Sequence, residues 1–225
     1  MKSESRNLLL DLDGTLIGVN ESRARLEFSI RWVAWWKERI GPWQALAGLR
    51  SLVRAVKTGD GGVSTNYERG IRVLARQWNQ DESAVEALLE LCLRDVFYPL
   101  KKRFHSNSNA QEFVNWASNH FNLYLVTNPV WPPELVQVRL AWAGIPVERF
   151  RSFTHAKRMT HCKPSPRFFT EFLSQESLQP ESCIMIGNSE KEDGIAASVG
   201  IRTFILTERL GFSDIRTHLE EKFGL

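Results

Sequence analysis

The stretch LLLDLDGTL, residues 8–16, joins a short apolar run to two acids that stand two positions apart. Such a compact apolar run predicts a buried strand. Side chains two apart on an extended chain point to the same face, so Asp11 and Asp13 share a face at the carboxyl end of this strand. Two carboxylates that close repel each other unless a cation or a proton intervenes. The stretch therefore indicates a site for a hard cation such as Mg²⁺, and Gly14 lets the chain turn sharply away beside it.

Outside a helical segment at residues 20–98, short apolar runs alternate with helical patterns. We expect strands at residues 7–11, 122–127, 151–155, 183–187 and 202–206, and helices at residues 109–120, 133–142, 166–174 and 192–199. This alternation predicts an α/β fold with a doubly wound parallel sheet. In such sheets the chemistry collects at the carboxyl ends of the strands, which is where Asp11 and Asp13 are expected.

The segment at residues 20–98 is predicted to be helical throughout, because its apolar residues recur at helical spacing between glycine-containing breaks. Four such stretches suggest a small helical bundle. We therefore divide the chain into an α/β core domain, residues 1–18 and 105–225, and an inserted helical domain, residues 19–104.

The eight tryptophans include Trp32, Trp35, Trp36 and Trp43 in this helical segment. Aromatic rings supply large apolar areas, so we favour packing between the helices. Two other interpretations stay open, namely the wall of a pocket for an aromatic or sugar substrate and a face that meets a second subunit. The protein is accordingly expected to be a monomer or a homodimer.

The composition is that of a folded, soluble protein, with 225 residues, 43% hydrophobic and 24% charged. A net charge of +3 is too small to indicate nucleic-acid binding. No apolar run approaches the length of about 20 residues that spans a bilayer, and the polar N-terminus does not resemble a secretory signal. Cys92, Cys162 and Cys183 show no metal-ligand or disulfide spacing. We expect reduced thiols in a cytoplasmic protein with no nucleic-acid or membrane partner.

Four segments in a fixed order resemble the motifs of the haloacid dehalogenase-like (HAD) hydrolase superfamily. The first is DLDGTL at residues 11–16, and the second is LYLVTN at residues 123–128. The third is KPSPRFF at residues 163–169, and the fourth is IMIGNS at residues 184–189, continuing to Asp193. The resemblance covers nearly the whole chain. It implies a Rossmann-like core, with the helical segment in the position where one large branch of the superfamily inserts an α-helical cap.

The resemblance also implies roles for individual residues. Asp11 would attack phosphorus and form an aspartyl phosphate. Asp13 would protonate the leaving alcohol and then deprotonate the attacking water. Thr127 and Asn128 would donate hydrogen bonds to the transferring phosphoryl oxygens. Lys163 would neutralise both the phosphoryl group and Asp11, because phosphoryl transfer depends on positioning and charge stabilisation.

The implied metal site uses the carboxylate of Asp11, the backbone carbonyl of Asp13 and the fourth motif. The fourth motif usually has an aspartate where this chain has Asn188. The amide oxygen of asparagine can ligate Mg²⁺ but brings no negative charge, so we expect weaker metal binding unless Glu192 or Asp193 compensates. We favour Asp193 as a direct or water-mediated ligand.

Together these residues predict a magnesium-dependent phosphatase that hydrolyses a small-molecule phosphate monoester. Asp13 disfavours a dehalogenase, because cleavage of a carbon–halogen bond needs no acid for a leaving alkoxide. A sugar phosphomutase on the same scaffold stays open as an alternative. So does a non-catalytic phospholigand-binding protein, which Asn188 favours and which the retention of Asp11, Asp13, Thr127 and Lys163 disfavours.

Overall fold

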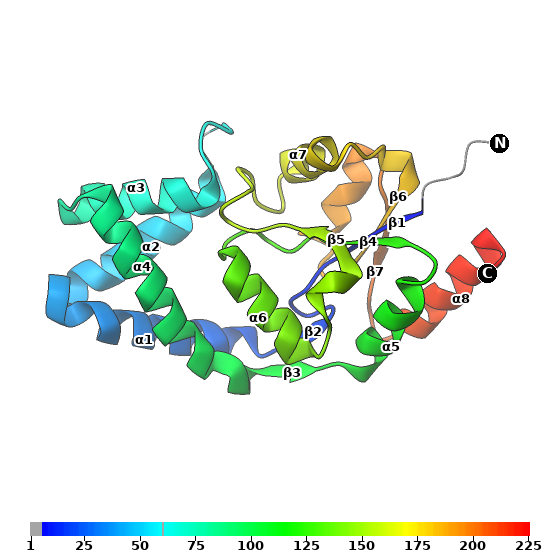
Figure 1. Cartoon of the computed structure of the whole chain (residues 1–225), viewed down its shortest axis with the longest axis horizontal. Coiled ribbons are helices and arrows are strands. Elements are labelled where there is room, and N and C mark those ends of the chain that lie inside the picture. The colour runs from blue at the N-terminus through cyan, green and yellow to red at the C-terminus, as the bar shows by residue number, and fades with distance from the viewer. Residues whose placement is uncertain (1–5, 60) are drawn as a thin grey trace.

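The structure, a computed structural model, describes residues 6–59 and 61–225. Residues 1–5 of the expected core domain and residue 60 of the expected helical domain lie outside the described residues. Figure 1 shows a bundle of four helices, α1 to α4, beside a sheet that is flanked by further helices. Across residues 6–59 and 61–225, no helix combines the length and the apolar composition that a membrane crossing requires.

The sheet has five strands in the order β5-β4-β1-β6-β7, and every neighbouring pair is parallel. Its strands are β1 (Asn7–Leu10), β4 (Asn122–Leu125), β5 (Phe150–Phe153), β6 (Cys183–Gly187) and β7 (Arg202–Ile205). These are the five strands expected from the apolar runs. The central strand β1 lies between β4 and β6, so the segments that follow these three strands meet at one edge of the sheet. Ligand sites of open α/β sheets lie at such an edge.

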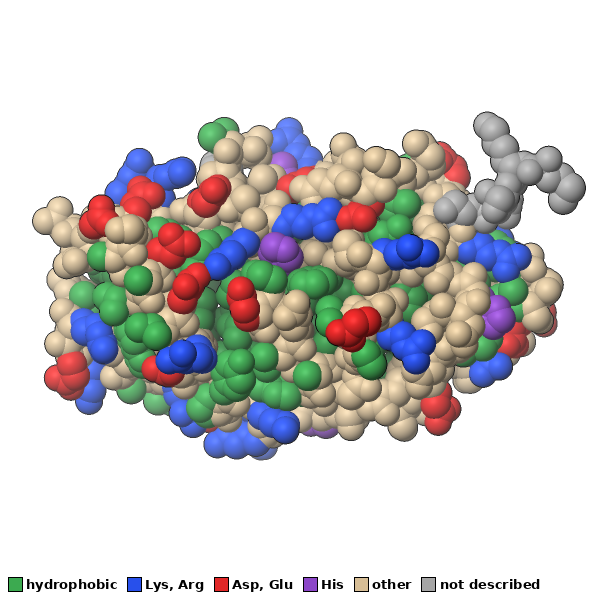
Figure 2. All heavy atoms as spheres, viewed as in Figure 1, with side chains coloured by type: hydrophobic (Ala, Val, Ile, Leu, Met, Phe, Trp, Pro, Cys, Tyr) green, Lys and Arg blue, Asp and Glu red, His purple; other side chains and the backbone are tan. Residues whose placement is uncertain are grey.

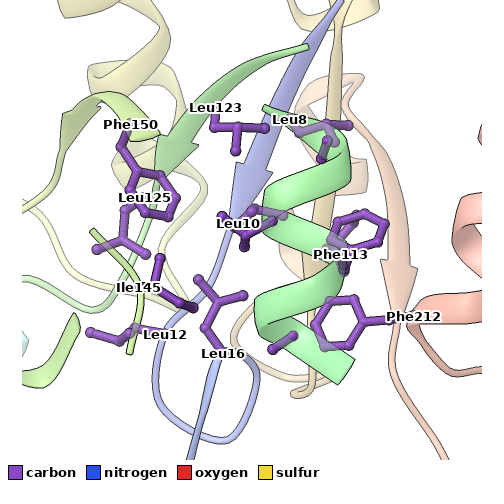
Figure 3. Packing of buried hydrophobic residues seen from close by; sticks show 14 of the residues in the cluster. Leu8, Leu10, Leu12, Leu16, Phe113, Leu123, Leu125, Ile145, Phe150 and Phe212 are labelled. Atoms are coloured by element: carbon purple, nitrogen blue, oxygen red, sulfur yellow. The ribbon is translucent and has the colours of Figure 1, made fainter. Parts of the chain in front are cut away.

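Alternate residues of β1 face opposite helical layers. Leu8 and Leu10 pack in one apolar cluster with α5 (Ser108–Ala117), α6 (Pro133–Ala143) and α8 (Phe212–Phe223). Leu9 packs on the other face, with α7 (Pro166–Glu176) and the 3₁₀ helix η4 (Gly194–Val199). Figure 3 shows Leu8 and Leu10 beside Phe113 of α5 and Phe212 of α8. Helices on both faces of a parallel sheet confirm the predicted doubly wound α/β fold.

The helical bundle consists of α1 (Glu21–Ile40), α2 (Pro42–Thr58), α3 (Asn66–Trp78) and α4 (Glu82–Phe97). Each start follows from local chemistry. The side chains of Asn20 and Asp81 accept backbone N–H groups of α1 and α4, and Thr65 forms a reciprocal capping box at α3. Pro42 opens α2, where a missing N–H costs nothing.

Tryptophans fill the centre of the bundle, as the sequence favoured. Trp32 and Trp36 are buried, and the ring centroids of Trp36 and Trp78 lie 4.5 Å apart. Trp43, in contrast, is 81% exposed and contributes little to this packing. The interpretation of the tryptophans as bundle core is therefore confirmed for Trp32 and Trp36 and is wrong for Trp43.

A short antiparallel ribbon links the bundle to the sheet. It pairs β2 (Ile17–Val19) with β3 (Phe104–Ser106), and the 3₁₀ helix η1 (Tyr98–Arg103) leads into β3. Glu27 of α1 accepts hydrogen bonds from Arg31 and from Arg103 of η1. The pKa of Glu27 falls to about 2, chiefly because Arg103 donates to it.

Three elements differ from the expectation. The ribbon and the C-terminal helix α8 were not predicted, and the helix expected at residues 192–199 is the shorter 3₁₀ helix η4, which begins at Gly194. The backbone N–H groups of Asp193 and Gly194 both donate to the carbonyl of Ser189, so a tight turn delays the helix start. Two further 3₁₀ turns, η2 (Val147–Arg149) and η3 (Pro180–Ser182), precede β5 and β6. Cys92, Cys162 and Cys183 are buried free thiols, as expected of small core residues.

Candidate active site

Asp11 follows β1 directly and lies at the centre of the site. Its backbone N–H donates to the carbonyl of Ile186 in β6, which extends the strand pairing by one residue. The carboxylate is buried, with 7% of the residue exposed. Its Oδ1 accepts a hydrogen bond from Lys163 Nζ at 2.9 Å, and its Oδ2 lies 3.2 Å from the hydroxyl of Thr15. Both carboxylate oxygens are therefore held in defined directions.

The turn after Asp11 brings the first and fourth motifs into contact. Gly14 has φ +85°, and a Cβ at this position would lie 2.4 Å from Asn188 Nδ2. Only glycine adopts this backbone conformation and leaves room for the asparagine. Thr15 Oγ1 lies 3.2 Å from Asn188 Oδ1 as well as from Asp11 Oδ2. Thr15 therefore orients the donor oxygens of both motifs, a role that the sequence reading did not assign to it.

Lys163 lies beside Asp11, in the loop just before α7, and is almost completely buried. Its ammonium group contacts Asp11 Oδ1 at 2.9 Å and Asp193 Oδ1 at 2.5 Å. Burial alone lowers the pKa of Lys163, but the attraction of Asp11 and then of Asp193 outweighs it and raises the pKa above its usual value. Lys163 is therefore a positive charge held beside Asp11.

Asp193 has both oxygens engaged. Oδ1 accepts from Lys163, and Oδ2 accepts the backbone N–H groups of Asn188 and Ser189 at 3.1 and 3.0 Å. A Cβ at Gly187 would lie 2.2 Å from Asp193 Oδ2, so the glycine permits this close approach. Asp193 thus holds Lys163 and the loop that carries Asn188 in one arrangement.

The surroundings of Asp11 bring its pKa close to neutral pH. Burial raises the pKa of Asp11, Lys163 lowers it, and the charges of Asp193 and Asp13 raise it again, to a value of about 7. Three acids, Asp11, Asp13 and Asp193, face two cations, Lys163 and Arg139, so the cluster has a deficit of positive charge. Such perturbed acids in a cavity are typical of functional sites.

Asp13 has a hydrogen-bond partner that was not predicted from the sequence. Arg139 of α6 donates from Nη1 to Asp13 Oδ2, although Arg139 is only 1% exposed. Burial raises the pKa of Asp13, and the charge of Arg139 opposes that shift. Among the described residues, Asp13 Oδ1 and Arg139 Nη2 have no hydrogen-bond partner. The available signal was an arginine within residues 135–143, a stretch that is apolar apart from Gln137 and Arg139.

Thr127 and Asn128 lie just beyond the end of β4. Thr127 is buried, and its carbonyl accepts a hydrogen bond from the Thr154 hydroxyl at 2.6 Å. Asn128 Nδ2 lies 3.3 Å from Glu192 Oε2 and 3.5 Å from the carbonyl of Lys163. Among the described residues, Asn128 Oδ1 has no hydrogen-bond partner. The structure thus places the second motif beside the third and the fourth.

The predicted site residues converge on one cavity of about 940 Å³ between the bundle and the core. Its core side is lined by Asp11, Asp13, Thr127, Asn128, Asn188 and Asp193. Lys163 lies below this surface, with a side chain that is 1% exposed. Residues far apart in the sequence are therefore assembled into one polar floor.

The oxygen donors of this floor fit a magnesium ion. Within residues 6–59 and 61–225, no group of three or more His, Cys, Asp or Glu side chains is arranged to hold a metal. The donors are instead mixed: the Asp11 carboxylate and the Asn188 amide oxygen both lie 3.2 Å from Thr15 Oγ1, and the Asp13 carbonyl follows in the chain. Magnesium commonly takes one or two carboxylates and completes its shell with water and substrate phosphate.

No protein-family model and no curated protein sequence matches the chain. Its structure does match solved structures over nearly its whole length. A 2-haloacid dehalogenase from Pseudomonas syringae pv. tomato is 15% identical with a TM-score of 0.63, over 97% of this chain and 99% of that chain. The chain has the haloacid dehalogenase (HAD) fold.

Two further HAD structures are similar. A predicted phosphoglycolate phosphatase from Haemophilus somnus is 18% identical with a TM-score of 0.56, over 97% of this chain and 100% of that chain. A HAD-family enzyme from Bacteroides thetaiotaomicron, solved with magnesium and inorganic phosphate, is 16% identical with a TM-score of 0.57, over 94% of this chain and 98% of that chain. The HAD fold predicted from the four motifs is therefore confirmed, while phosphatases and dehalogenases share it.

Proposed function

We propose that this protein is a HAD-superfamily phosphatase that uses Mg²⁺ and hydrolyses a small-molecule phosphate monoester through an aspartyl phosphate on Asp11. Residues 1–18 and 105–225 form the catalytic core in this proposal, and residues 19–104 form its cap. The observation that carries it is the arrangement of Asp11 between Lys163 and Thr15, with Asp13 two residues further along the chain. Fold alone does not carry it, because one fold hosts many activities.

Asp11 is the nucleophile. Its oxygen forms the bond to phosphorus while the bond from phosphorus to the leaving alcohol oxygen breaks. Lys163, at 2.9 Å, neutralises Asp11 before attack and the transferring phosphoryl group afterwards. Asp193 keeps Lys163 in place through its contact at 2.5 Å. Lys163 already contacts Asp11, so its charge is in position before the substrate binds.

Asp13 serves as acid and then as base. It gives a proton to the leaving alcohol oxygen, and it later takes a proton from the water that attacks the phosphorus of the aspartyl phosphate. That second step releases inorganic phosphate and restores Asp11. Arg139 fixes Oδ2 of Asp13 and so sets the orientation of the whole carboxyl group. Arg139 is thus a positioning residue in this proposal.

Thr127 and Asn128 bind the phosphoryl oxygens. Both line the cavity at the edge of the sheet where Asp11 lies. The hydroxyl of Thr127 provides a donor for an anion. Asn128 Nδ2 donates to Glu192 and to the carbonyl of Lys163, and it would exchange one of these acceptors for a phosphoryl oxygen. Phosphoryl transfer requires such positioning more than covalent help from the protein.

Magnesium would be held by the Asp11 carboxylate, the Asp13 carbonyl and the Asn188 amide oxygen. When bound, it supplies positive charge that the buried acid cluster lacks. Both oxygens of Asp193 already accept hydrogen bonds, so we assign Asp193 to a water-mediated contact with the metal. Asn188 brings no charge, which predicts weak metal affinity.

Asp13 favours a phosphatase over a dehalogenase, although both kinds of enzyme share the fold. A departing alkoxide needs a proton, whereas a departing halide does not. The similar Bacteroides enzyme with bound magnesium and inorganic phosphate supports the same choice. A non-catalytic phospholigand-binding protein is the second candidate, favoured only by Asn188.

The test is hydrolysis of p-nitrophenyl phosphate and acetyl phosphate by the purified protein, with and without Mg²⁺. We expect turnover that requires Mg²⁺ and that is abolished in Asp11→Asn. Asp95→Asn is a matched control, because Asp95 lies on α4 outside the cavity lining. Absence of turnover with both substrates at millimolar Mg²⁺, together with measurable phosphate binding, would favour the non-catalytic candidate instead.

A further inference from the structure

The cavity above Asp11 is larger than a small phosphorylated metabolite requires. Its volume of about 940 Å³ lies at the upper end of ordinary ligand pockets, which run from about 300 to about 1,000 Å³. The catalytic residues occupy only its core side. Most of the other lining residues belong to the helical bundle.

Apolar side chains form the wall of the cavity on the bundle side. Three helices contribute them, with Phe28 from α1, Leu46, Leu49 and Val53 from α2, and Leu93 from α4. In the space-filling view, hydrophobic side chains gather on the bundle and where the bundle meets the core (Figure 2). Leu49 and Leu93 are buried, whereas Val53 is 46% exposed. The cavity therefore has an apolar interior behind a more open edge.

An aromatic group joins this wall to the catalytic floor. Trp131 comes three residues after Asn128, and it lines the same cavity. Its ring centroid lies 5.2 Å from that of Phe28 and 4.8 Å from that of Phe97, both in edge-to-face geometry. Apolar surface thus begins close to the phosphoryl site and continues into the bundle.

The charged groups of α2 lie at the edge of the cavity and not in its interior. Arg50, Arg54 and Lys57 stand at i, i+4 and i+7 on the helix, and all three are exposed. Glu21, the acid that the bundle contributes to the lining, is paired with Arg25. A positive edge attracts an anionic substrate from solution, while the interior offers apolar contacts.

Hydrogen bonds between α3 and the core hold the cavity in this shape. The backbone N–H groups of Asn66 and Tyr67 donate to the carbonyls of Met159 and Ala156. Arg69 donates to the carbonyl of Thr160 at 2.9 Å. These bonds join the bundle to the loop that precedes Lys163, in addition to the β2–β3 ribbon. The bundle that carries the apolar wall is therefore joined to the core at two places.

We propose that the substrate is a phosphate monoester of an alcohol with a large apolar body, such as an alkyl, aromatic or isoprenoid group. The phosphate lies at Asp11, and the apolar body occupies the space bounded by α1, α2, α4 and Trp131. This inference rests on the proposed phosphatase function for the position of the phosphate. A phosphorylated hydroxy acid or sugar would leave the apolar wall in contact with water.

The test is calorimetric binding of alkylphosphonates, which resemble phosphate monoesters but are not hydrolysed, to the wild-type protein with Mg²⁺. From ethyl- to octylphosphonate, we expect the Kd to fall about fourfold for each added methylene, as burial of that group predicts. The heat-capacity change of binding becomes more negative along the series. A Kd that is independent of chain length, or lowest for ethylphosphonate, would overturn the proposal.

Two matched variants locate the effect. Val53→Asn places a polar group in the cavity wall, and we expect octylphosphonate to bind about fivefold more weakly, while ethylphosphonate binding changes little. Leu91→Asn makes a similar change on α4, at a residue that is 43% exposed and outside the cavity lining, so the chain-length dependence should persist. Equal loss in both variants would contradict the assigned location.

Hydrolysis assays separate this inference from the proposed function. Turnover of acetyl phosphate without any preference among alkyl phosphates would support the phosphatase and overturn the apolar substrate. Chain-length-dependent binding without turnover of octyl phosphate would support the apolar ligand and overturn the phosphatase.

Discussion

Arg139, in the middle of α6, donates a hydrogen bond to the carboxylate of Asp13, although only 1% of the arginine is exposed. A buried arginine that contacts the proposed acid–base residue sets the direction of that carboxylate. It also stabilises the charged form of Asp13, against the effect of burial. A residue outside the four motifs therefore affects the pKa of Asp13.

Replacing Arg139 should change the pH dependence of turnover. In Arg139→Met, Asp13 loses the positive charge that lowers its pKa, so the pKa rises. Because the acid must be protonated to act, we expect the basic limb of the kcat profile to move up by about one pH unit. Arg139→Lys keeps the charge and should keep most of the wild-type profile. Identical profiles for wild type and Arg139→Met would contradict the positioning role.

The pKa of about 7 for Asp11 links stability to pH and metal. Its ordinary value is 3.8, so the folded protein binds this proton more tightly than the unfolded chain does. The contribution is present below pH 4 and is lost as the pH rises through 7. Without metal, we expect the free energy of unfolding to fall by on the order of 3 kcal/mol over this range. Denaturant titrations at several pH values measure it.

Two comparisons check that assignment. Asp11→Asn removes the titrating group and should flatten this part of the pH dependence. In the proposed site Mg²⁺ would bind the deprotonated carboxylate, so we expect it to stabilise the wild type more at pH 8 than at pH 5. A pH dependence that is the same in Asp11→Asn would assign the loss of stability to other groups.

In the proposed metal site, we expect Asn188 to limit how tightly Mg²⁺ binds. Asn188→Asp adds a negative charge beside Asp11 without changing the size of the side chain, and ligand charge tunes the affinity of oxygen sites. We expect the Mg²⁺ concentration for half-maximal turnover to fall about tenfold. Ser189→Ala, one residue further along, serves as a control that adds no charge. An unchanged Mg²⁺ requirement in Asn188→Asp would exclude Asn188 from the metal site.

The glycines of the bundle differ in how tightly they are packed. A Cβ at Gly48 would lie 2.5 Å from the Trp78 ring, whereas one at Gly70 would lie 2.6 Å from Leu52 Cδ1, the end of a flexible side chain. We expect Gly48→Ala to destabilise the protein by about 1–3 kcal/mol despite the better helix propensity of alanine. Gly70→Ala should cost less, because Leu52 can change its rotamer. Thermal unfolding of both variants tests the comparison.

The sequence predicted the sheet and the polar floor of the cavity from local signals. Strands β1, β4 and β6 are short, mainly apolar runs, and the acids and the Thr127 position follow such runs directly. The period of the apolar residues likewise indicated the four bundle helices. Each of these features is formed by residues that are close together in the chain, so patterns in the sequence reveal it.

The contact between Arg139 and Asp13 and the cavity could not be predicted from the sequence, because both depend on residues that lie far apart in the chain. Arg139 lies 126 positions from Asp13, and only the packing of α6 against the core brings the two together. The ribbon of β2 and β3 has three residues in each strand, too few for a periodic pattern. The apolar residues of α2 predicted a helix. They did not indicate that part of the apolar face of α2 borders a cavity instead of packing against another helix.

The most direct test of the central claim is rapid-quench mass spectrometry of the peptide Asn7–Arg23 during turnover of acetyl phosphate with Mg²⁺. We predict a peptide that is heavier by one phosphoryl group, with fragmentation that places the group on Asp11. The adduct should appear before inorganic phosphate and should be absent in Asp11→Asn. Steady turnover with no adduct, or an adduct on another residue, would contradict the account.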